Sequence, residues 1–229
     1  DFMATAYNVK YKDQSLSKWE PNEFIDYKVE KLPGFDNTDS DGNIVFIGIL
    51  TPETKTTTKA ENVVNFTFET KNEILKDVEE IADKYPGKNN VVIVLSHAGN
   101  KSKEENGLLG TDFCKIEDVD YVFDGHSHEI IAPEKDGKYI NNGKNLRAVG
   151  KLDISITDKQ VTTELSQAKY NDVKNTLKNY TDSQDVKDKV ANIENKIKAV
   201  SGKTNLEINS LPIAFTDRNI KSQSTPLGR

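Results

Sequence analysis

The sequence has a single cysteine, no excess of positive charge and no long apolar run. Cys114 is the only cysteine, which excludes an internal disulfide and a cysteine metal cluster and predicts a small buried thiol rather than a catalyst. The formal net charge of -6 and the pI near 5.3 argue against a protein that binds the phosphate backbone of a nucleic acid. No segment is apolar enough to predict a membrane span, and no signal peptide is evident at the start.

Enough apolar residues remain for a conventional folded core. The 229 residues include 35% hydrophobic and 30% charged residues, and the mean hydropathy is -0.66. A chain of this length forms one large domain or two small ones and buries about 70% of the surface that its unfolded form exposes. We therefore expect a soluble, folded protein.

Histidine is also scarce, but its placement carries the functional signal. The sequence has three histidines, His97, His126 and His128, and each follows a short apolar run, at 91–95 or at 121–123. Such runs predict buried strands, and ligands of open α/β sheets gather beyond the carboxyl ends of the strands. In an extended segment, His126 and His128 would point to the same side.

Imidazole suits both metal binding and proton transfer. The neutral ring is a favoured ligand of zinc, iron, copper and nickel, and it acts as an acid or base near pH 7. Gly125 precedes the histidine pair and, having no Cβ, would let the backbone bend close to an ion. A single histidine after a strand is usually a hydrogen-bonded residue without such a function, so the joint placement of all three is what predicts a metal site.

The apolar pattern elsewhere predicts an α/β fold. Residues 44–50 form a strand that Thr51-Pro52 ends, and apolar residues at helical spacing over 74–85 predict an amphipathic helix that stops at Pro86-Gly87. This helix leads directly into the strand at 91–95, as in a parallel crossover unit. Residues 2–9 predict a first strand, and the alternation over 152–156 predicts an antiparallel strand that closes the edge of the sheet.

The character of the chain changes after Asn171. A narrow apolar seam repeats at intervals of four and three on an otherwise polar helix, and it consists of Val186, Val190, Ile193, Ile197 and Val200. We expect this seam to face a core rather than a coiled-coil partner, because it lasts barely two heptads. A weak strand follows at 213–215.

Three segments together resemble the bacterial 5'-nucleotidase family of the calcineurin-like metallophosphoesterases, which also includes 2',3'-cyclic phosphodiesterases and UDP-sugar hydrolases. They are IGILTPET at 47–54, VLSHAG at 94–99 and DGHSH at 124–128. The resemblance covers nearly all of the chain. It implies an α/β fold that comprises the second half of an α-β-β-α metallophosphoesterase sandwich followed by a long linker helix.

The resemblance also implies a site with two divalent metal ions, such as zinc or manganese. His97 and His126 would bind one ion and His128 the other, and the two ions would clamp a phosphoryl group and activate a water as the hydroxide nucleophile. The family's early Asp-x-His motif, second aspartate and Asn-His-Glu element have no counterpart in this sequence. We expect Asp124 to orient an imidazole without binding a metal itself, and Glu129 to be a solvated edge residue.

By the same resemblance, the chain divides into three parts. Residues 1–168 correspond to a partial metallophosphoesterase domain, 169–202 to the linker helix and 203–229 to the start of a C-terminal substrate-binding domain. In that last part, Lys221 stands where the family has an arginine for the substrate's phosphate, or Arg218 substitutes from nearby.

The expected function is hydrolysis of nucleotide or other phosphate esters by a parent protein that is extracellular, on the cell surface or periplasmic. Because half of the family's ligand set is absent, we expect the 229-residue chain alone to be inactive or nearly so. The alternative is a non-enzymatic fragment that binds a metal or a phosphate through the histidines. A purely structural zinc site is disfavoured, because closed sites of that kind usually have four protein ligands.

Overall fold

The computed structural model describes residues 4–13, 24–25, 27–102, 107–134, 137–172 and 184–201. The chain divides into two compact units, residues 1–174 and 175–229. The predicted strand at 213–215, Lys221 and Arg218 lie outside the described residues, so the roles expected of them and the domain limits at 168 and 202 stay predictions.

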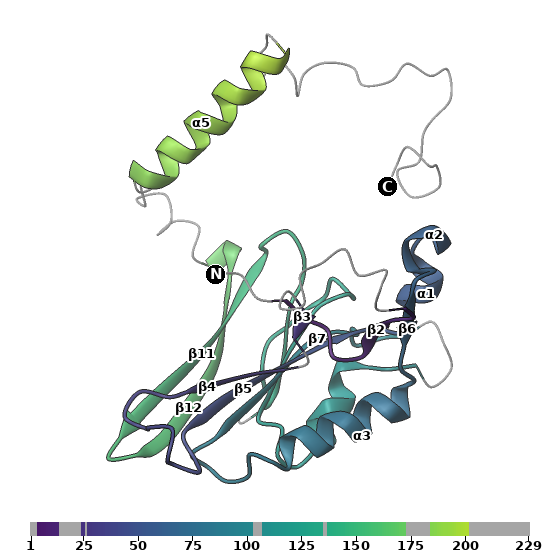
Figure 1. Ribbon diagram of the computed structural model, residues 1–229. Helices are drawn as coiled ribbons and strands as arrows, with labels where there is room; N and C mark the ends of the chain where they lie inside the picture. Colours follow the sequence, from purple (N-terminus) through teal and green to yellow (C-terminus); the bar gives the residue numbers. More distant parts are fainter. Residues whose placement is uncertain are drawn as a thin grey trace. The chain divides into compact units, whose positions relative to one another are not determined.

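A six-stranded mixed sheet forms the centre of the first unit, in the order β4-β5-β7-β8-β10-β9 (Figure 1). Its strands are β4 Tyr27–Lys31, β5 Asn43–Leu50, β7 Val91–His97, β8 Tyr121–Asp124, β10 Tyr139–Asn142 and β9 Ile130–Ile131. The four inner strands run parallel, and β4 and β9 pair antiparallel at the two edges. The α/β class predicted from the sequence is confirmed, and the strands predicted at 44–50, 91–95 and 121–123 are all present.

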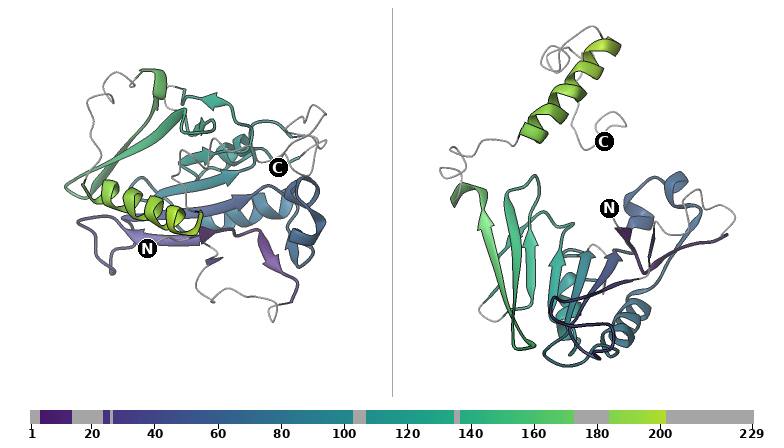
Figure 2. Two further views of the ribbon diagram at one scale, coloured as in Figure 1. Left: turned by 90° about the horizontal axis from the view of Figure 1, so that it is seen from above. Right: turned by 60° about the vertical axis from the view of Figure 1, so that its left-hand side comes forward.

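Alternate residues of β7 bury against opposite faces of the sheet. Val92 and Val94 belong to a core cluster that includes Ile74 and Val78 of α3, which spans Lys71–Ala82. Val91 and Ile93 belong to the cluster on the other face. Figures 1 and 2 show α3 on one side of the sheet and the long β11–β12 hairpin on the other. The continuous apolar run in the sequence therefore reflects a strand buried on both faces.

The hairpin consists of β11 Ala148–Thr157 and β12 Gln160–Lys169, paired antiparallel. We expected the strand at 152–156 to close an edge of the main sheet, and this prediction is wrong, because the two strands form a separate two-stranded sheet. The reason is that Leu152, Ile154 and Ile156 pack against the cluster of Val91 and Ile93. The alternation of apolar residues therefore reflects a face buried against this cluster, and not pairing with an edge strand of the main sheet.

Helix α3 overlaps the segment predicted as helical, 74–85, but begins three residues earlier. Thr70 and Glu73 form a capping box, in which Thr70 Oγ1 accepts from the Glu73 amide at 3.4 Å and Glu73 Oε2 accepts from the Thr70 amide at 2.7 Å. These bonds satisfy amides that the first turn of a helix leaves without partners. The helix ends at Ala82, three residues before the predicted limit.

The strand predicted at 2–9 is wrong. Within the described residues of this segment, β1 Ala4–Thr5 pairs with β3 Phe24–Ile25, and β2 Val9–Tyr11 pairs with β6 Phe66–Phe68. The chain turns between them at Asn8, which is fully buried. The Asn8 side chain donates to the Leu50 carbonyl at 2.6 Å and accepts from the Leu50 amide at 3.0 Å. Two short helices, α1 Thr54–Thr57 and α2 Ala60–Val63, precede β6.

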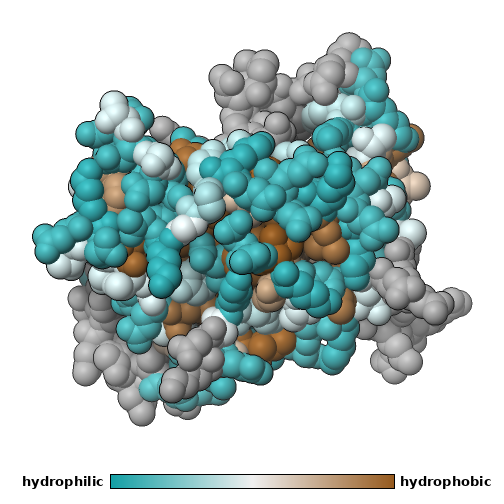
Figure 3. Space-filling view, turned by 90° about the horizontal axis from the view of Figure 1, so that it is seen from below, coloured by the Kyte–Doolittle hydropathy of each residue, from teal (hydrophilic) through white to brown (hydrophobic). Residues whose placement is uncertain are grey.

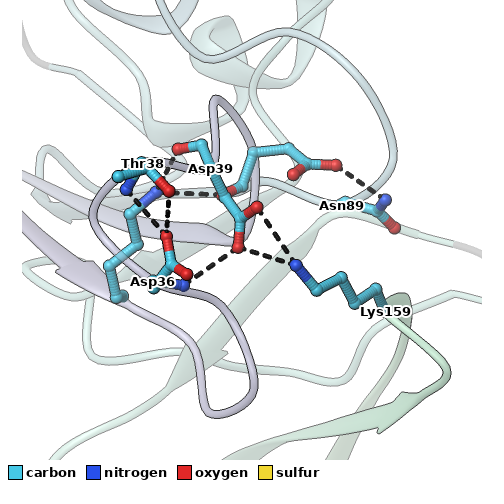
Figure 4. Close-up of polar contacts among 7 residues, drawn as sticks. Asp36, Thr38, Asp39, Asn89 and Lys159 are labelled. Atoms are coloured by element: carbon cyan, nitrogen blue, oxygen red, sulfur yellow. Dashed lines mark hydrogen bonds and ion pairs between the residues drawn. The ribbon is translucent and has the colours of Figure 1, made fainter.

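A polar network, which we call the amino-end clasp, closes the end of the sheet where the parallel strands begin (Figure 4). Asp36 Oδ1 accepts from the Thr38 amide at 2.8 Å, and Asp39 Oδ2 accepts from the Asp36 amide at 2.9 Å. Lys159, in the turn of the β11–β12 hairpin, donates to both Asp39 carboxylate oxygens at 2.9 and 3.1 Å. Asn89, just before β7, donates to Asp41 Oδ2 at 2.9 Å. The clasp therefore ties three segments of the chain together.

The second unit contributes helix α5, Gln184–Ser201. Of the predicted apolar seam, Val190 and Ile193 are exposed within this unit, and the core-facing role stays a prediction. The structure describes only the backbone of the other three seam residues, Val186, Ile197 and Val200. No helix among the described residues combines the length and apolar character that crossing a membrane requires. The face shown in Figure 3 is largely hydrophilic, with small apolar patches.

Candidate functional site

The carboxyl ends of β7 and β8 bring two of the three histidines together. His97 is the last residue of β7, and its neighbour Ser96 is paired with Asp124, the last residue of β8. His126 follows two residues later, and its ring lies 5.1 Å from that of His97 between centroids, at an interplanar angle of 71°. The two runs predicted as strands therefore deliver imidazoles to one place.

A groove of about 410 Å³, which we call the histidine groove, lies at this edge. Its lining combines apolar side chains with His97 and Asp124, and consists of Ala6, Ile49, Leu50, Leu95, Ser96, His97, Phe123, Asp124 and Gly125. Leu95 is 42% exposed even though it lies within a central strand. The edge thus offers imidazole donors next to an open apolar surface.

The backbone of the histidine pair differs from the extended form that we expected. His126 has a φ of 70° and His128 a φ of 59°, both in the left-handed region. The alternation argument for these two side chains is therefore wrong. A residue other than glycine in this region costs about 1–3 kcal/mol, and such positions cluster at functional sites. The segment keeps this conformation because the surrounding contacts hold it.

Two glycines leave room for the imidazoles. A Cβ on Gly125 would lie 3.0 Å from His97 Nδ1. A Cβ on Gly99, whose φ is 80°, would lie 3.3 Å from the Ser127 amide nitrogen and 3.4 Å from His126 Cδ2. Contacts of 3.0–3.4 Å are tighter than nearly all real Cβ contacts. Glycine at these two positions therefore lets the loops after β7 and β8 approach each other.

Asp124 anchors the loop that follows His97. Its Oδ1 accepts from the amides of Ala98 and Gly99, each at 3.1 Å, and its Oδ2 accepts from the Tyr139 hydroxyl at 2.6 Å. Among the described residues, no hydrogen bond joins Asp124 to a histidine ring. Its carboxylate thus fixes the backbone next to His97, whereas direct orientation of an imidazole stays a prediction.

The sequence did not reveal the residues that support the loops after β7 and β8. Asn141, fully buried in β10, donates to the Gly125 carbonyl at 3.1 Å and to Ser127 Oγ at 3.2 Å. Tyr139 reaches Asp124 from the same strand. No local signal in the sequence shows which distant loop a buried asparagine will bind.

The pKa of His97 lies below its usual value. Desolvation of the ring is the main cause, followed by the neighbouring His126, while Asp124 opposes the shift and His128 adds to it slightly. The pKa of the Tyr139 hydroxyl is raised by burial and by its hydrogen bond to Asp124. At neutral pH, His97 is therefore an uncharged ring with a free nitrogen lone pair, and the Tyr139 hydroxyl stays protonated as a hydrogen-bond donor to Asp124.

These donors fit a metal ion in part. The rings of His97 and His126 are in contact, and imidazole is a donor type that zinc and similar ions bind. Among the residues that the structure describes, no three His, Cys, Asp or Glu side chains gather in a group that could hold a metal. His128 is exposed and influences His97 electrostatically. The described donors are fewer than a closed metal site needs, and a metal-binding role for the histidines stays a prediction.

The remaining candidates are placed as follows. Glu129 accepts from Asn100 Nδ2 at 2.7 Å and pairs with Lys101, and its side chain is 43% exposed, in agreement with the predicted edge position. Cys114 is half-buried against the core, and burial raises the pKa of its thiol, as expected of a structural cysteine.

Comparison with known proteins gives a family and a fold. The family model described as calcineurin-like phosphoesterase matches residues 2–129. A solved structure of a putative 5'-nucleotidase from Staphylococcus aureus, in complex with alpha-ketoglutarate, is 18% identical, with a TM-score of 0.53 over 74% of this chain and 33% of that one. The calcineurin-like phosphoesterase YfkN from Bacillus subtilis is 15% identical, with a TM-score of 0.50 over 78% of this chain and 63% of that one.

The chain therefore spans less than two thirds of the length of either structure. At these identities the likeness concerns the fold alone. No curated protein matches the sequence.

Proposed function

Because this chain belongs to the calcineurin-like phosphoesterase family, we propose that the protein hydrolyses phosphate esters at the histidine groove with divalent metal ions held in part by His97, His126 and His128. Enzymes of this family are hydrolases that generally use divalent metals. The observation that carries the proposal is the contact of two imidazoles, 5.1 Å between centroids, at the carboxyl edge of the sheet.

The metal ions would polarise a phosphoryl oxygen and so favour attack by water. Residues of the chain itself supply the remaining functions, which are to present donors and to hold them in position. His97 and His126 present imidazole nitrogen donors, Asp124 fixes the amides beside His97, and Asn141 holds the loop of His126. This rigid support keeps the donors in place before a substrate arrives, which is what efficient catalytic positioning requires.

Nucleotides are the substrates that we propose within this class, and we place the parent protein outside the cytoplasm. Both statements rest on the resemblance of the 47–54, 94–99 and 124–128 segments to 5'-nucleotidases. The likeness to the putative 5'-nucleotidase structure supports the fold that these statements require. Lys221 or Arg218 remains the proposed contact for the substrate's phosphate.

The second candidate is a metal- or phosphate-binding module without catalysis. It is favoured by the absence of a group of three metal donors among the described residues. The test is a phosphatase assay on the 229-residue chain with AMP and added manganese or zinc. We expect binding of metal with little or no turnover, because few donors converge among the residues that the structure describes.

Two results decide between the candidates. Turnover by this chain comparable with that of longer relatives would show that it needs no further donors and would contradict the expected inactivity. Weak metal-dependent turnover that His97→Ala abolishes would support hydrolysis at the histidine groove. Metal binding without any release of phosphate would favour the binding module.

A further inference from the structure

An apolar cavity of about 350 Å³ lies next to the histidine groove. It is formed by the β2–β6 ribbon and by the segment that follows β5, and its lining consists of Ala6, Val9, Tyr11, Leu50, Thr54, Thr58, Asn62, Val63, Phe66 and Phe68. Its volume falls in the range of small-molecule sites, which are mostly apolar with a few polar groups. We call it the aromatic cavity.

The aromatic cavity and the histidine groove share two lining residues, Ala6 and Leu50. Leu50 is also the Cα partner of His97 in the β5–β7 ladder. Neighbouring strands lie about 4.8 Å apart. A small molecule with its anionic group at His97 could therefore place an attached apolar group in the aromatic cavity.

The walls of the cavity suit a flat ring. The rings of Tyr11 and Phe66 lie 4.6 Å apart between centroids, tilted by 38°, and an inserted aromatic ring would gain stacking or edge contacts beyond simple burial. In the described part of the chain, the side chains of Thr54, Thr58 and Asn62 make no hydrogen bond with other residues. Their polar atoms are available to orient a ligand.

We propose that the aromatic cavity binds the aromatic leaving group of the phosphate ester that is hydrolysed at the histidine groove, so that aryl phosphates are a substrate class. This inference rests on the function proposed above. In the reaction, water oxygen bonds to phosphorus, the phosphorus–oxygen bond to the aryl group breaks, and the aryl oxygen leaves with a proton as a phenol. Phosphate is the other product.

The test measures binding to the purified 229-residue chain by titration calorimetry. The probes are 1-naphthol, which has the ring without phosphate, and 1-naphthyl phosphate with and without zinc. We expect 1-naphthol to bind without metal. Phe66→Ala, which removes a wall, and Val63→Trp, which fills the cavity from its rim, should each weaken 1-naphthol binding about tenfold or more.

Val64→Ala is the matched control, since Val64 adjoins Val63, is 56% exposed and does not line the cavity. Its 1-naphthol affinity should equal that of the unchanged protein. Thermal unfolding of every variant shows whether the fold survives. Because the two test variants act in opposite ways, by loss and by gain of volume, a folding defect in one leaves the other decisive.

Each outcome has a defined meaning. No 1-naphthol binding by the unchanged chain, or equal binding by Phe66→Ala and Val63→Trp, would overturn the proposal. Tighter binding of decyl phosphate than of 1-naphthyl phosphate would also overturn it, in favour of an alkyl-chain site. If 1-naphthol binds in the cavity but zinc adds nothing to the affinity for 1-naphthyl phosphate, the phosphoesterase function fails while the aromatic site stands.

Discussion

The two ends of the parallel strands in the central sheet are built in opposite ways. At the amino ends, the amino-end clasp satisfies its charges internally, as when Lys159 binds both carboxylate oxygens of Asp39. At the carboxyl ends, the imidazoles of His97 and His126 border an open groove, and His126 and His128 have left-handed backbone. A polar network whose hydrogen bonds are all satisfied internally stabilises the fold. Strained backbone beside exposed metal or proton donors is instead typical of a binding site.

The largest effect on stability is expected at the histidine end, from Gly110→Ala. A Cβ there would lie 2.3 Å from Asp124 Oδ2 and 2.9 Å from Tyr139 Cε2. Because neither group can move without losing the anchor of the His97 loop, we expect a loss of about 3 kcal/mol in the free energy of unfolding. Urea denaturation measures it.

Gly34→Ala is the matched control at the other end of the sheet. Gly34 has a φ of 87°, and a Cβ there would meet nothing within 4 Å. The cost should be only that of the left-handed backbone, about 1–2 kcal/mol. Equal losses for the two variants would contradict the tight packing that we assign to the histidine end.

An intermediate effect is expected from Asn90→Ala, at the start of β7. Asn90 Oδ1 accepts from the Asn43 amide at 3.0 Å and from Asn43 Nδ2 at 2.8 Å, and both residues are buried. The change would remove both of these bonds, leaving Asn43 Nδ2 with its longer bond of 3.3 Å to the Ser40 carbonyl, and should cost about 2 kcal/mol. Zinc affinity, measured by calorimetry, should stay unchanged. The exposed Asn72→Ala is the control, and a fall in zinc affinity for Asn90→Ala would show that the two ends are not independent.

A smaller, pH-dependent effect is expected at Asp112. Burial alone would raise the pKa of this carboxyl, but hydrogen bonds from Lys115 and Lys71 outweigh it and leave the pKa below its usual value. The stabilisation is therefore fully present above the unfolded pKa of about 3.9 and is lost as the pH falls through the lower folded pKa.

Asp112→Asn should accordingly lower the free energy of unfolding at pH 7 by about 1 kcal/mol or more, because it removes charge-assisted bonds to Lys71 at 2.7 Å and to Lys115 at 2.8 Å. It should also flatten the decline in stability below pH 4. Acid titrations of both proteins, followed by circular dichroism, test this. A decline of the same steepness in the variant would assign the acid sensitivity to other carboxyls.

The smallest effect is expected from Lys159→Met in the amino-end clasp. The Lys159–Asp39 ion pair is exposed, with 56% of the lysine side chain accessible, and such pairs contribute little because water screens them. The thermal unfolding midpoint should stay close to that of the unchanged protein. A large drop would show that the clasp depends on this single pair rather than on the backbone bonds of the 36–41 turn.

Much of the fold could be predicted from the sequence because its signals are local. The run at 91–95 shows a strand buried on both faces, and the spacing over 74–85 shows the buried stripe of α3, including Ile74 and Val78. The errors arose where a distant contact decides the outcome. Asn8 turns the chain by bonding to Leu50, and the β11–β12 hairpin covers a face that its own alternation does not identify.

The candidate site was predictable only as a location. Strand ends followed by His97 and His126 placed two imidazoles at one edge, and the structure confirms that they lie together. The left-handed backbone of His126 and the supports from Tyr139 and Asn141 were not predictable, because they depend on contacts with β10.

The most direct test of the proposed metal site is an NMR titration of the histidine rings in the 229-residue chain with zinc. We expect the ring signals of His97 and His126 to shift together and to saturate, and His97→Ala to weaken the response of His126 at least about tenfold, since even loss of a group that supports a ligand costs 10–100-fold. Ring signals that remain unchanged by zinc, or that respond independently of one another, would contradict a shared metal site at the carboxyl edge of the sheet.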